Sequence, residues 1–307
     1  MNKMVSDSTA TEKKMGNWFY HLIALVIVII WGSTLVSSKV LLQAGMREDE
    51  IFFARIVMAY ICIIFISPRK LWSDTWRDEF WMLMLGITGG SLYFISENYA
   101  LRYTMANNVS FIVSASPLIT TLLAFAFTKG MKLGKMLIIG TVLALTGVAI
   151  VIFNGQIGPV KLNPIGDLLA IVSSFCFGLY CLLLKKLGNR YSSVFITRKV
   201  FAYGLLTTLP CFIFMPWQFR LAHFLAPNVM FNLLFLGLIA SFACFALWSV
   251  TTKRLGAVVT ANYNYISPIA TIVVSWWFLG EQMTIMSWVG CALILAGVIL
   301  ANKDTKE

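Results

Sequence analysis

The sequence predicts an all-α integral membrane protein with ten transmembrane helices, built as two inverted five-helix repeats around a central cavity. Three observations predict this fold class: the apolar composition, a series of long apolar segments, and an alignment between the two halves of the chain. Of the 307 residues, 59% are hydrophobic and only 12% are charged. A typical soluble chain is about a quarter charged, so long apolar runs with so few charges indicate a membrane protein.

The predicted helices follow one another with short polar connections. A helix needs about 20 apolar residues to cross the hydrocarbon core of a bilayer. Because the backbone must satisfy its own hydrogen bonds in lipid, each spanning segment is expected to be a helix. Polar tails are expected at 1–17 and 303–307, and the first apolar segment is too long for a signal-peptide core. The qualifying segments are, in order, 18–42, 51–67, 80–100, 106–127, 134–153, 164–186, 195–215, 229–251, 258–279 and 284–302.

The distribution of Lys and Arg predicts the orientation in the membrane. A net charge of +11 would suggest nucleic-acid binding in a soluble protein. Here the basic residues cluster in short loops between apolar runs, as membrane topology requires, and no solvated basic face is left for phosphate contacts. Placing the N-terminus inside puts most basic residues, and both termini, on the cytoplasmic side. The exceptions are Lys39, Arg47, Arg55, Arg102, Lys161 and Arg220.

Cysteine and histidine usage argues against a metal, disulfide or catalytic site. All six cysteines lie within apolar runs and no CxxC motif occurs, so they are expected to be small apolar fillers. His21 and His223 lie far apart in the sequence. The motifs HExxH and GxSxG are missing from the sequence, as is a P-loop. We therefore expect no enzyme activity, no cofactor, no metal site and no direct drive by ATP.

The two halves of the chain align with each other over most of their length. "FWMLMLG" matches "FNLLFLG", and the same offset of 151 residues places Pro117 on Pro268 without a gap. "IFFARIVMAY" matches "VFITRKVFAY", which places Arg55 on Arg198. "IGTVLALTGVAIV" matches "VGCALILAGVILA" near the two ends. Glycines recur two turns apart in this last pair of segments, and we expect them to allow close helix packing.

An odd number of helices in each repeat fixes the relation between the repeats. Five helices per copy require the second copy to run through the membrane in the opposite direction. Inverted repeats are typical of secondary transporters, because two equivalent halves give an outward-open and an inward-open state. We expect the repeats to occupy 18–153 and 164–302.

The combination resembles the EamA family of the drug/metabolite transporter superfamily. The resemblance covers nearly the whole chain, and "WGSTLVSSKVLL" and "ANYNYISPIATIVVSWWFLGEQMTIMSWVGCALILAGVILA" carry it together with the paired five-helix copies. It implies a metabolite transporter, often an exporter, with a central cavity between the repeats. We expect a cell-membrane location, in the inner membrane of a bacterium. The resemblance does not supply the transported compound.

Three basic residues lie toward the outer mouth against the positive-inside rule. Lys39, Arg55 and Arg102 are the outer members of a symmetric arrangement whose inner members are Lys185, Arg198 and Lys253. One hypothesis is a cationic vestibule that attracts anionic or zwitterionic metabolites. The alternatives are that Lys39 extends to the interface, and that Arg55 pairs with carboxylates of the loop at 48–50.

Glu97 is the candidate coupling residue. It lies late in the third predicted helix, where the second copy has Trp248, so it breaks the internal symmetry. A carboxylate inside a membrane is costly and usually faces a cavity or a cation. It could load and release a proton as the cavity alternates. The alternative is a structural ion pair with Arg102 or Lys39.

Other polar and aromatic residues are candidates for the cavity wall and for hinges. Pro117 and Pro268 occupy equivalent places within helices, where proline removes a donor and produces a kink. They are expected to act as hinges or to give static curvature. Amides inside a span need partners, so some of the patch near Pro268 is expected to face the cavity. The cavity candidates are Trp31, Thr34, Lys39, Arg55, Asn98, Tyr180, Asn262, Tyr263 and Asn264.

The leading hypothesis is therefore a secondary active transporter that exports a small metabolite, an amino-acid-like compound or an amphipathic compound by alternating access, with proton coupling as an option. An uptake or exchange carrier is the main alternative, and a membrane-embedded enzyme or a channel is less favoured. The expected partners are the small-molecule substrate, the lipid bilayer and protons, but no nucleic acid. A homodimer remains an open alternative.

Overall fold

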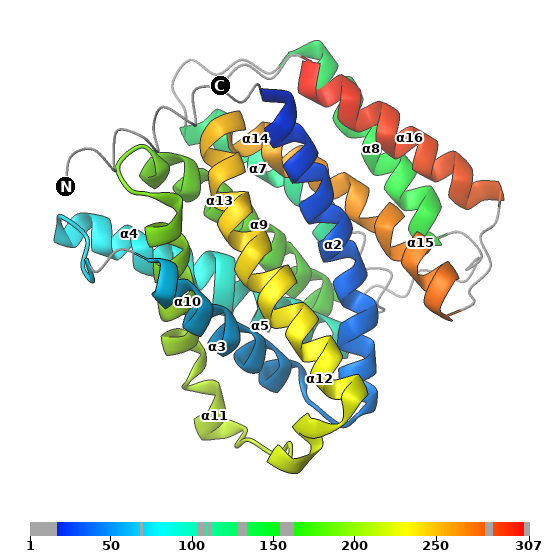
Figure 1. Ribbon diagram of the computed structural model, residues 1–307. Coiled ribbons are helices and arrows are strands. Elements are labelled where there is room, and N and C mark those ends of the chain that lie inside the picture. The colour runs from blue at the N-terminus through cyan, green and yellow to red at the C-terminus, as the bar shows by residue number, and fades with distance from the viewer. Residues whose placement is uncertain are drawn as a thin grey trace.

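The computed structural model describes residues 17–67, 70–103, 109, 112–127, 134–153, 163–279 and 285–303. Within these ranges every regular element is a helix (Figure 1). The all-α prediction is confirmed for this part of the chain. The polar tails at 1–16 and 304–307 lie outside the described residues.

Helices lie in each of the apolar segments predicted from the sequence. In the first half these are α2 (Asn17–Gln43), α3 (Glu48–Ile66), α4 (Trp76–Gly86), the π-helix η1 (Ile87–Ser91), α5 (Leu92–Tyr103), α7 (Ser116–Phe127) and α8 (Lys135–Phe153). The second half contains α9 (Pro164–Gly188), α10 (Ser193–Thr208), α11 (Cys211–Phe214), the 3-10 helix η2 (Leu221–Leu225), α12 (Pro227–Leu234), the π-helix η3 (Phe235–Ala243), α13 (Cys244–Leu255), α14 (Ala257–Asn262), the 3-10 helix η4 (Tyr263–Ile266), α15 (Ser267–Leu279) and α16 (Ile285–Lys303).

Length and composition single out some of these helices as membrane spans. Within the described residues, three stretches are long and apolar enough to cross a bilayer: Asn17–Thr34, Pro164–Gly188 and Pro227–Leu255. Shorter apolar helices are Ser116–Phe127, Lys135–Ile150 and Trp288–Lys303. An apolar, all-helical architecture with several such helices is that of a multi-pass membrane protein.

Local sequence sets several helix starts. Thr75 precedes α4 and accepts a hydrogen bond from Asp78 N at 3.1 Å. Asn163 precedes α9, followed by Pro164 at the first helical position, and Ser192 precedes α10. Side-chain oxygens at these positions satisfy amide groups that have no partner inside the helix.

The internal repeat is visible as matching breaks in two helices. The π-helix η1 interrupts the helix formed by α4 and α5, and η3 interrupts the one formed by α12 and α13. The offset of 151 residues places η1 inside η3. Gly90 in η1 has non-helical angles (φ −128°, ψ −107°), which produce a kink. Both copies thus have an irregular turn at the same place, and π-turns often mark functional regions.

The two halves interleave instead of packing as separate units. α2 of the first half packs against α13 and α15 of the second, and α9 of the second half packs against α5 and α7 of the first. In the same way α3 contacts η3, while α10 contacts α4 and η1. Each of these contacts has a counterpart in the other half, so the arrangement follows the internal repeat.

Glycines allow α8 and α16 to approach each other at backbone distance. A methyl group on Gly147 would lie 2.6 Å from Gly290 O, and one on Gly297 would lie 2.6 Å from Gly140 O. Gly140 therefore lies beside Gly297 while Gly147 lies beside Gly290, so the two helices run antiparallel. Since α8 and α16 are equivalent in the repeat, their opposite directions agree with an inverted relation.

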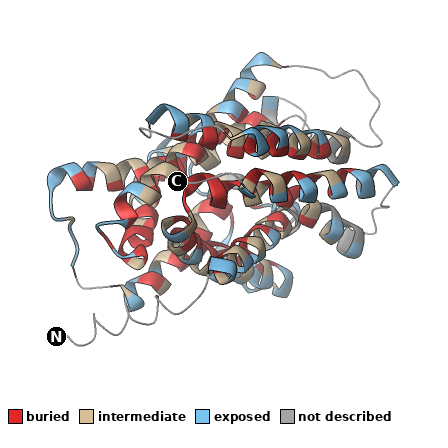
Figure 2. Ribbon diagram, turned by 90° about the horizontal axis from the view of Figure 1, so that it is seen from above, coloured by how far each residue is buried: buried red, intermediate tan, exposed pale blue. Residues whose placement is uncertain are grey.

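The outer surface of the bundle is apolar. Buried residues line the inward sides of the helices and exposed residues lie on the outward sides (Figure 2). Phe65, Phe214 and Ile285 each expose more than four fifths of their surface. Exposed apolar side chains of this size on many helices fit contact with lipid. The largest core cluster includes residues of α2, α3, α9, α10 and α13.

Replacing Gly147 with Leu should destabilise the protein. The larger side chain must separate α8 from α16, and overpacking of this kind costs about 1–3 kcal/mol. Val142→Leu is the control, because Val142 lies on the exposed face of α8. Thermal unfolding in detergent would give a lower midpoint for Gly147→Leu only. Equal midpoints for both variants would contradict the close approach of these helices.

Candidate functional site

A polar cluster with two buried and two half-buried members lies where the two halves meet. Its members are Arg55 of α3, Tyr93 and Glu97 of α5, and Ser241 of η3, and we call it the Arg55 cluster. Arg55 is only 6% exposed, and its Nε donates to Ser241 Oγ at 2.7 Å. Ser241 lies in the π-helical turn of the second half, so this hydrogen bond joins the halves.

The guanidinium of Arg55 is held on one edge and one face. The ring of Phe94 lies 5.4 Å from its Cζ, a cation–π contact. Among the hydrogen bonds in the described part of the chain, Arg55 makes one, through Nε. Its two terminal amino groups form a planar fork that matches a carboxylate or phosphate. A buried fork of this kind can receive an anionic group.

Glu97 lies beside this guanidinium. Tyr93 donates a hydrogen bond from its hydroxyl to Glu97 Oε1 at 3.3 Å. Arg55 and Glu97 attract each other electrostatically, and Cys244 of α13 lies near Arg55. The expected partners Arg102 and Lys39 have side chains outside the described residues, as does Asn98. The neighbour that the structure does describe, Arg55, comes from another helix.

Two of the three loop carboxylates considered as partners of Arg55 bind elsewhere. Asp49 pairs with Arg47 at 2.6 Å. Glu50 accepts hydrogen bonds from the backbone amides of Gln218 and Phe219 at 2.5 and 3.1 Å. The side chain of Glu48 lies outside the described residues. Arg55 is thus available to the interior of the bundle.

Trp31, Thr34 and Tyr180 are packed within the helix bundle. Trp31 Nε1 donates to Ala240 O in η3 at 3.0 Å, and its ring lies 4.8 Å from that of Trp248. Thr34 donates to Trp31 O on its own helix at 2.6 Å. Tyr180 is 2% exposed and lies against Gly89 of η1. Both aromatic rings therefore rest on a π-helical turn of the opposite half.

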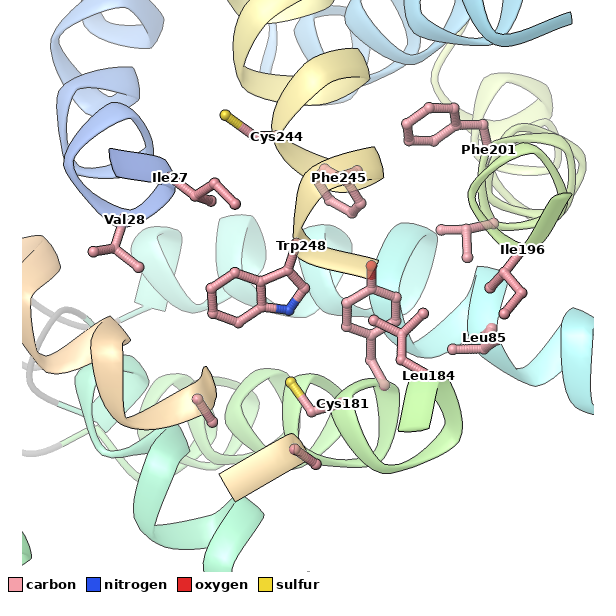
Figure 3. Close-up of a cluster of buried hydrophobic side chains, with 14 of the residues drawn as sticks. Ile27, Val28, Leu85, Cys181, Leu184, Ile196, Phe201, Cys244, Phe245 and Trp248 are labelled. Atoms are coloured by element: carbon pink, nitrogen blue, oxygen red, sulfur yellow. The ribbon is translucent and has the colours of Figure 1, made fainter. Parts of the chain in front are cut away.

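An aromatic series connects Trp31 with the Arg55 cluster. The ring of Trp248 lies 6.0 Å from Phe177, and Phe177 lies 6.1 Å from Tyr93. Trp248 points from α13 toward Cys181 of α9 (Figure 3). These rings come from four helices of both halves and form an apolar wall next to Arg55 and Glu97.

The polar patch on α14 and η4 has partners outside the Arg55 cluster. Asn262 is fully buried and donates from Nδ2 to Asn302 Oδ1 at 2.8 Å. The hydroxyl of Tyr263 lies 2.7 Å from His21 Nδ1. Asn264 is half-buried. Asn262 and Tyr263 therefore lie beside α16 and α2 and not at the Arg55 cluster.

The equivalent prolines both begin a new helical segment. Pro117 is the second residue of α7, and Pro268 is the second residue of α15 after the 3-10 turn η4. Proline is well tolerated in the first turn of a helix, where its missing amide has no intrahelical partner. The prolines thus lie at breaks in the helical path.

An ion-pair network that sequence reasoning missed joins α4 to α10. Lys199 donates to Glu79 Oε1, as does the hydroxyl of Tyr203, and both charged side chains are 8% exposed. The Ser73 amide donates to Glu79 Oε2 at 2.7 Å. Glu79 replaces Met230 of the other copy, and Lys199 replaces Ile56. Comparing the two copies of the repeat, which singled out Glu97, would also have singled out Glu79 and Lys199.

A second pair extends this network. Arg190 binds Asp78 at 2.9 Å, and Tyr191 donates to Asp78 Oδ2 at 2.8 Å. Burial raises the pKa of Tyr191. In the neighbouring loop, the hydrogen bond from Lys70 lowers the pKa of Asp74. Within the described residues, no group of His, Cys, Asp and Glu is arranged to hold a metal ion.

The predicted inner basic residues also lie at this end. Lys185 donates from Nζ to Lys253 O at 3.2 Å, and Arg198 donates to Lys70 O. Lys185 and Arg198 thus donate to backbone oxygens near the ends of helices, where a positive charge is favourable.

Comparison with known proteins identifies the family. The model of the EamA-like transporter family matches residues 18–153 and again residues 164–303. The chain belongs to the EamA-like transporter family. Members of this family are named transporters and efflux pumps, so the protein is a transporter and not an enzyme.

Relatives of this EamA protein come from bacteria and archaea. An "uncharacterized transporter" of Archaeoglobus fulgidus is 24% identical and covers 92% of this chain and 96% of its own length. A "probable terminal-alkyne amino-acid exporter" of Streptantibioticus cattleyicolor is 26% identical, and the match covers 92% of this chain and 93% of the exporter. A "probable amino-acid metabolite efflux pump" of Escherichia coli is 21% identical, and the match covers 91% of this chain and 93% of the pump.

A solved crystal structure shares the fold. It superposes with a TM-score of 0.74 at 16% identity, covering 93% of this chain and 97% of the other. At this identity the likeness concerns the fold alone. The prediction of an EamA architecture with two matching halves is thereby confirmed.

Replacing Glu79 with Gln should destabilise this EamA protein by about 3 kcal/mol, because Lys199 would be left charged and without its carboxylate partner in a buried site. Asp74→Asn is the matched control, since it makes the same chemical change in an exposed pair, and exposed pairs contribute little. Chemical unfolding followed by tryptophan fluorescence measures both. A Glu79→Gln protein as stable as Asp74→Asn would argue against a structural role for the pair.

Proposed function

We propose that the protein is a secondary active transporter that exports a small amino-acid-like or amphipathic metabolite by alternating access. Ten membrane spans would form two inverted five-helix repeats, at 18–153 and 164–302, around a central cavity. Both termini would lie in the cytoplasm, and the protein would reside in the cell membrane. An uptake or exchange carrier with the same architecture is the alternative.

The Arg55 cluster is the observation that carries this proposal. It brings together a guanidinium with an open fork from α3, a half-buried carboxylate from α5 and a hydroxyl from η3. The contributing helices come from both halves, so a relative motion of the halves would change the surroundings of these groups. Alternating access requires a site whose exposure changes in this way.

The chemistry of the cluster favours a substrate that carries a carboxylate. Arg55 can bind a carboxylate through two parallel hydrogen bonds. Glu97 can bind an ammonium group or carry a proton, and the rings of Tyr93, Phe177 and Trp248 offer an apolar wall. The names of two relatives, an amino-acid exporter and an amino-acid metabolite efflux pump, support the same substrate class.

The other cavity candidates extend this proposal. Thr34, Lys39 and Asn98 would contribute polar contacts near Arg55, while Trp31 and Tyr180 would form the wall. Asn262, Tyr263 and Asn264 would act near the break at Pro268. Pro117 and Pro268 would serve as hinges, because helix breaks at equivalent positions let both halves bend alike. Lipid, protons and a second copy of the chain are the proposed partners.

Export can be tested by untargeted metabolomics of the culture medium. Cells that overproduce the protein should accumulate a specific carboxylate-bearing compound outside, relative to an empty-vector control. Arg55→Gln should reduce this accumulation at least tenfold, because the charged fork is lost. Arg220→Gln is the control, since Arg220 is an exposed outer arginine. An unchanged medium would favour uptake or exchange, and full activity of Arg55→Gln would remove Arg55 from the substrate site.

Proton coupling can be tested at Glu97. In proteoliposomes loaded with the compound identified in the medium, an imposed pH gradient should drive transport by the wild type. Glu97→Gln should lose the response to the gradient while keeping exchange of substrate for substrate, because a neutral amide cannot carry a proton. Asp74→Asn serves as the control carboxylate. A Glu97→Gln protein that still follows the pH gradient would exclude Glu97 from coupling.

A further inference from the structure

Four buried polar groups on two adjoining helices have no hydrogen-bond partner within the described part of the chain: those of Thr197 of α10 and of Trp248, Ser249 and Thr252 of α13. Ser173 of α9 is equally buried, and its hydroxyl lies within reach of the Tyr93 hydroxyl alone. Each residue is at most 2% exposed. α9, α10 and α13 pack against one another. We call these five residues the polar track.

The neighbouring hydroxyls on α9 and α13 do find partners inside their own helices. Serine and threonine in a helix commonly bond to a carbonyl of the preceding turn. Ser174 does so with Ala170 O at 3.1 Å, and Thr251 does so with Leu247 O at 2.7 Å. Ser173 and Thr252, each next to one of them in sequence, do not. Their hydroxyls are thus available to a small polar guest.

The track begins beside the Arg55 cluster. Ser173 lies next to Tyr93, whose hydroxyl donates to Glu97. The ring of Phe177, one turn further along α9, contacts both Tyr93 and Trp248. The track therefore leads from Tyr93 of α5 to Trp248 of α13, next to the rings of the aromatic series. In Figure 3, Trp248 lies between α13 and α9.

From Trp248 the track follows α9 and α13 toward the end where the inner basic residues lie. Thr252 lies one turn after Trp248, on the same face of α13. The next residue, Lys253, accepts a hydrogen bond from Lys185 of α9 and packs against Gly188. α9 and α13 thus run side by side in the same direction over this stretch. Polar side chains of α13 thus follow its contact with α9 as far as Lys253, at the end where the inner basic residues lie.

We propose that the polar track holds a file of ordered water molecules that connects Glu97 with the inner end of the helices. Buried waters typically make about three hydrogen bonds to polar groups that otherwise lack partners. Trp248 can only donate, so it would orient a water oxygen. The hydroxyls of Ser173, Thr197, Ser249 and Thr252 can both donate and accept.

Such a file gives Glu97 a route for protons, an inference that rests on the proposed coupling role of Glu97. A proton entering at the inner end would join the first water, and each water would pass one proton to the next. The last transfer, through water or the Tyr93 hydroxyl, would protonate the Glu97 carboxylate. No member of the file changes its own protonation state. Among the described side chains, the charged or titratable groups that act on Glu97 are Arg55 of α3 and Tyr93 of α5, and Cys244 of α13 acts on Arg55.

Radiolytic hydroxyl-radical labelling of the purified protein in nanodiscs tests the water file without any substrate. Radicals formed from bound water oxidise the side chains next to it. Trp248 should be oxidised rapidly although it is fully buried, whereas Phe201, which is 1% exposed in the same core, should not. Thr252→Val should lower the labelling of Trp248 at least threefold, and the matched variant Thr251→Val should leave it unchanged. Labelling of Trp248 as slow as that of Phe201, or equal labelling in both valine variants, would overturn the water file.

A second measurement tests the proton route. The infrared carboxyl band of Glu97, identified by its loss in Glu97→Gln, should respond to a pH jump. The response should slow at least threefold in Thr252→Val but not in Thr251→Val. Equal rates would overturn the route. A carboxyl band that does not titrate would overturn the route together with the proposed coupling at Glu97, while the labelling result would still decide whether water occupies the track.

Discussion

Close helix contact across the two halves is the constraint on which the rest of this structure depends. Lipid offers no hydrophobic force to hold helices together, so association relies on van der Waals packing between surfaces that can approach closely. Gly140 and Gly147 of α8 meet Gly297 and Gly290 of α16 at backbone distance. Gly32 of α2 also meets the Ser267 carbonyl of α15. Each of these contacts joins one half to the other.

The same packing decides where polar groups can be tolerated. Because α3 packs on η3, Arg55 reaches Ser241 and is buried with a partner from the opposite half. Because α10 packs on α4, Lys199 reaches Glu79. Buried charges without partners are costly, so the charged residues depend on the helix pairs that the glycines and other small residues permit. The candidate site is thus a consequence of how the halves interleave.

Departures from internal symmetry mark the residues that distinguish the two halves. The scaffold repeats closely, down to the π-helical turns η1 and η3. The charged pairs do not, since Glu97, Glu79 and Lys199 each replace an apolar or aromatic residue of the other copy. A symmetric scaffold would make the outward-facing and inward-facing states equivalent in energy. Asymmetric charges remove this equivalence, so the two halves of the scaffold differ in energy wherever these residues are buried.

The sequence by itself determined the helical segments, their apolar surfaces, the internal repeat and the family, because periodicity and composition are local properties that bilayer physics limits strongly. It also singled out Arg55 and Glu97, because charged residues inside apolar segments are rare. Only the tertiary structure decided their partners. Arg55 bonds to Ser241, which lies 186 residues away, and Arg55 lies beside Glu97 although no sequence pattern joined the two. Helix-to-helix contacts depend on side-chain shape across distant segments, and a linear pattern does not encode which faces will meet.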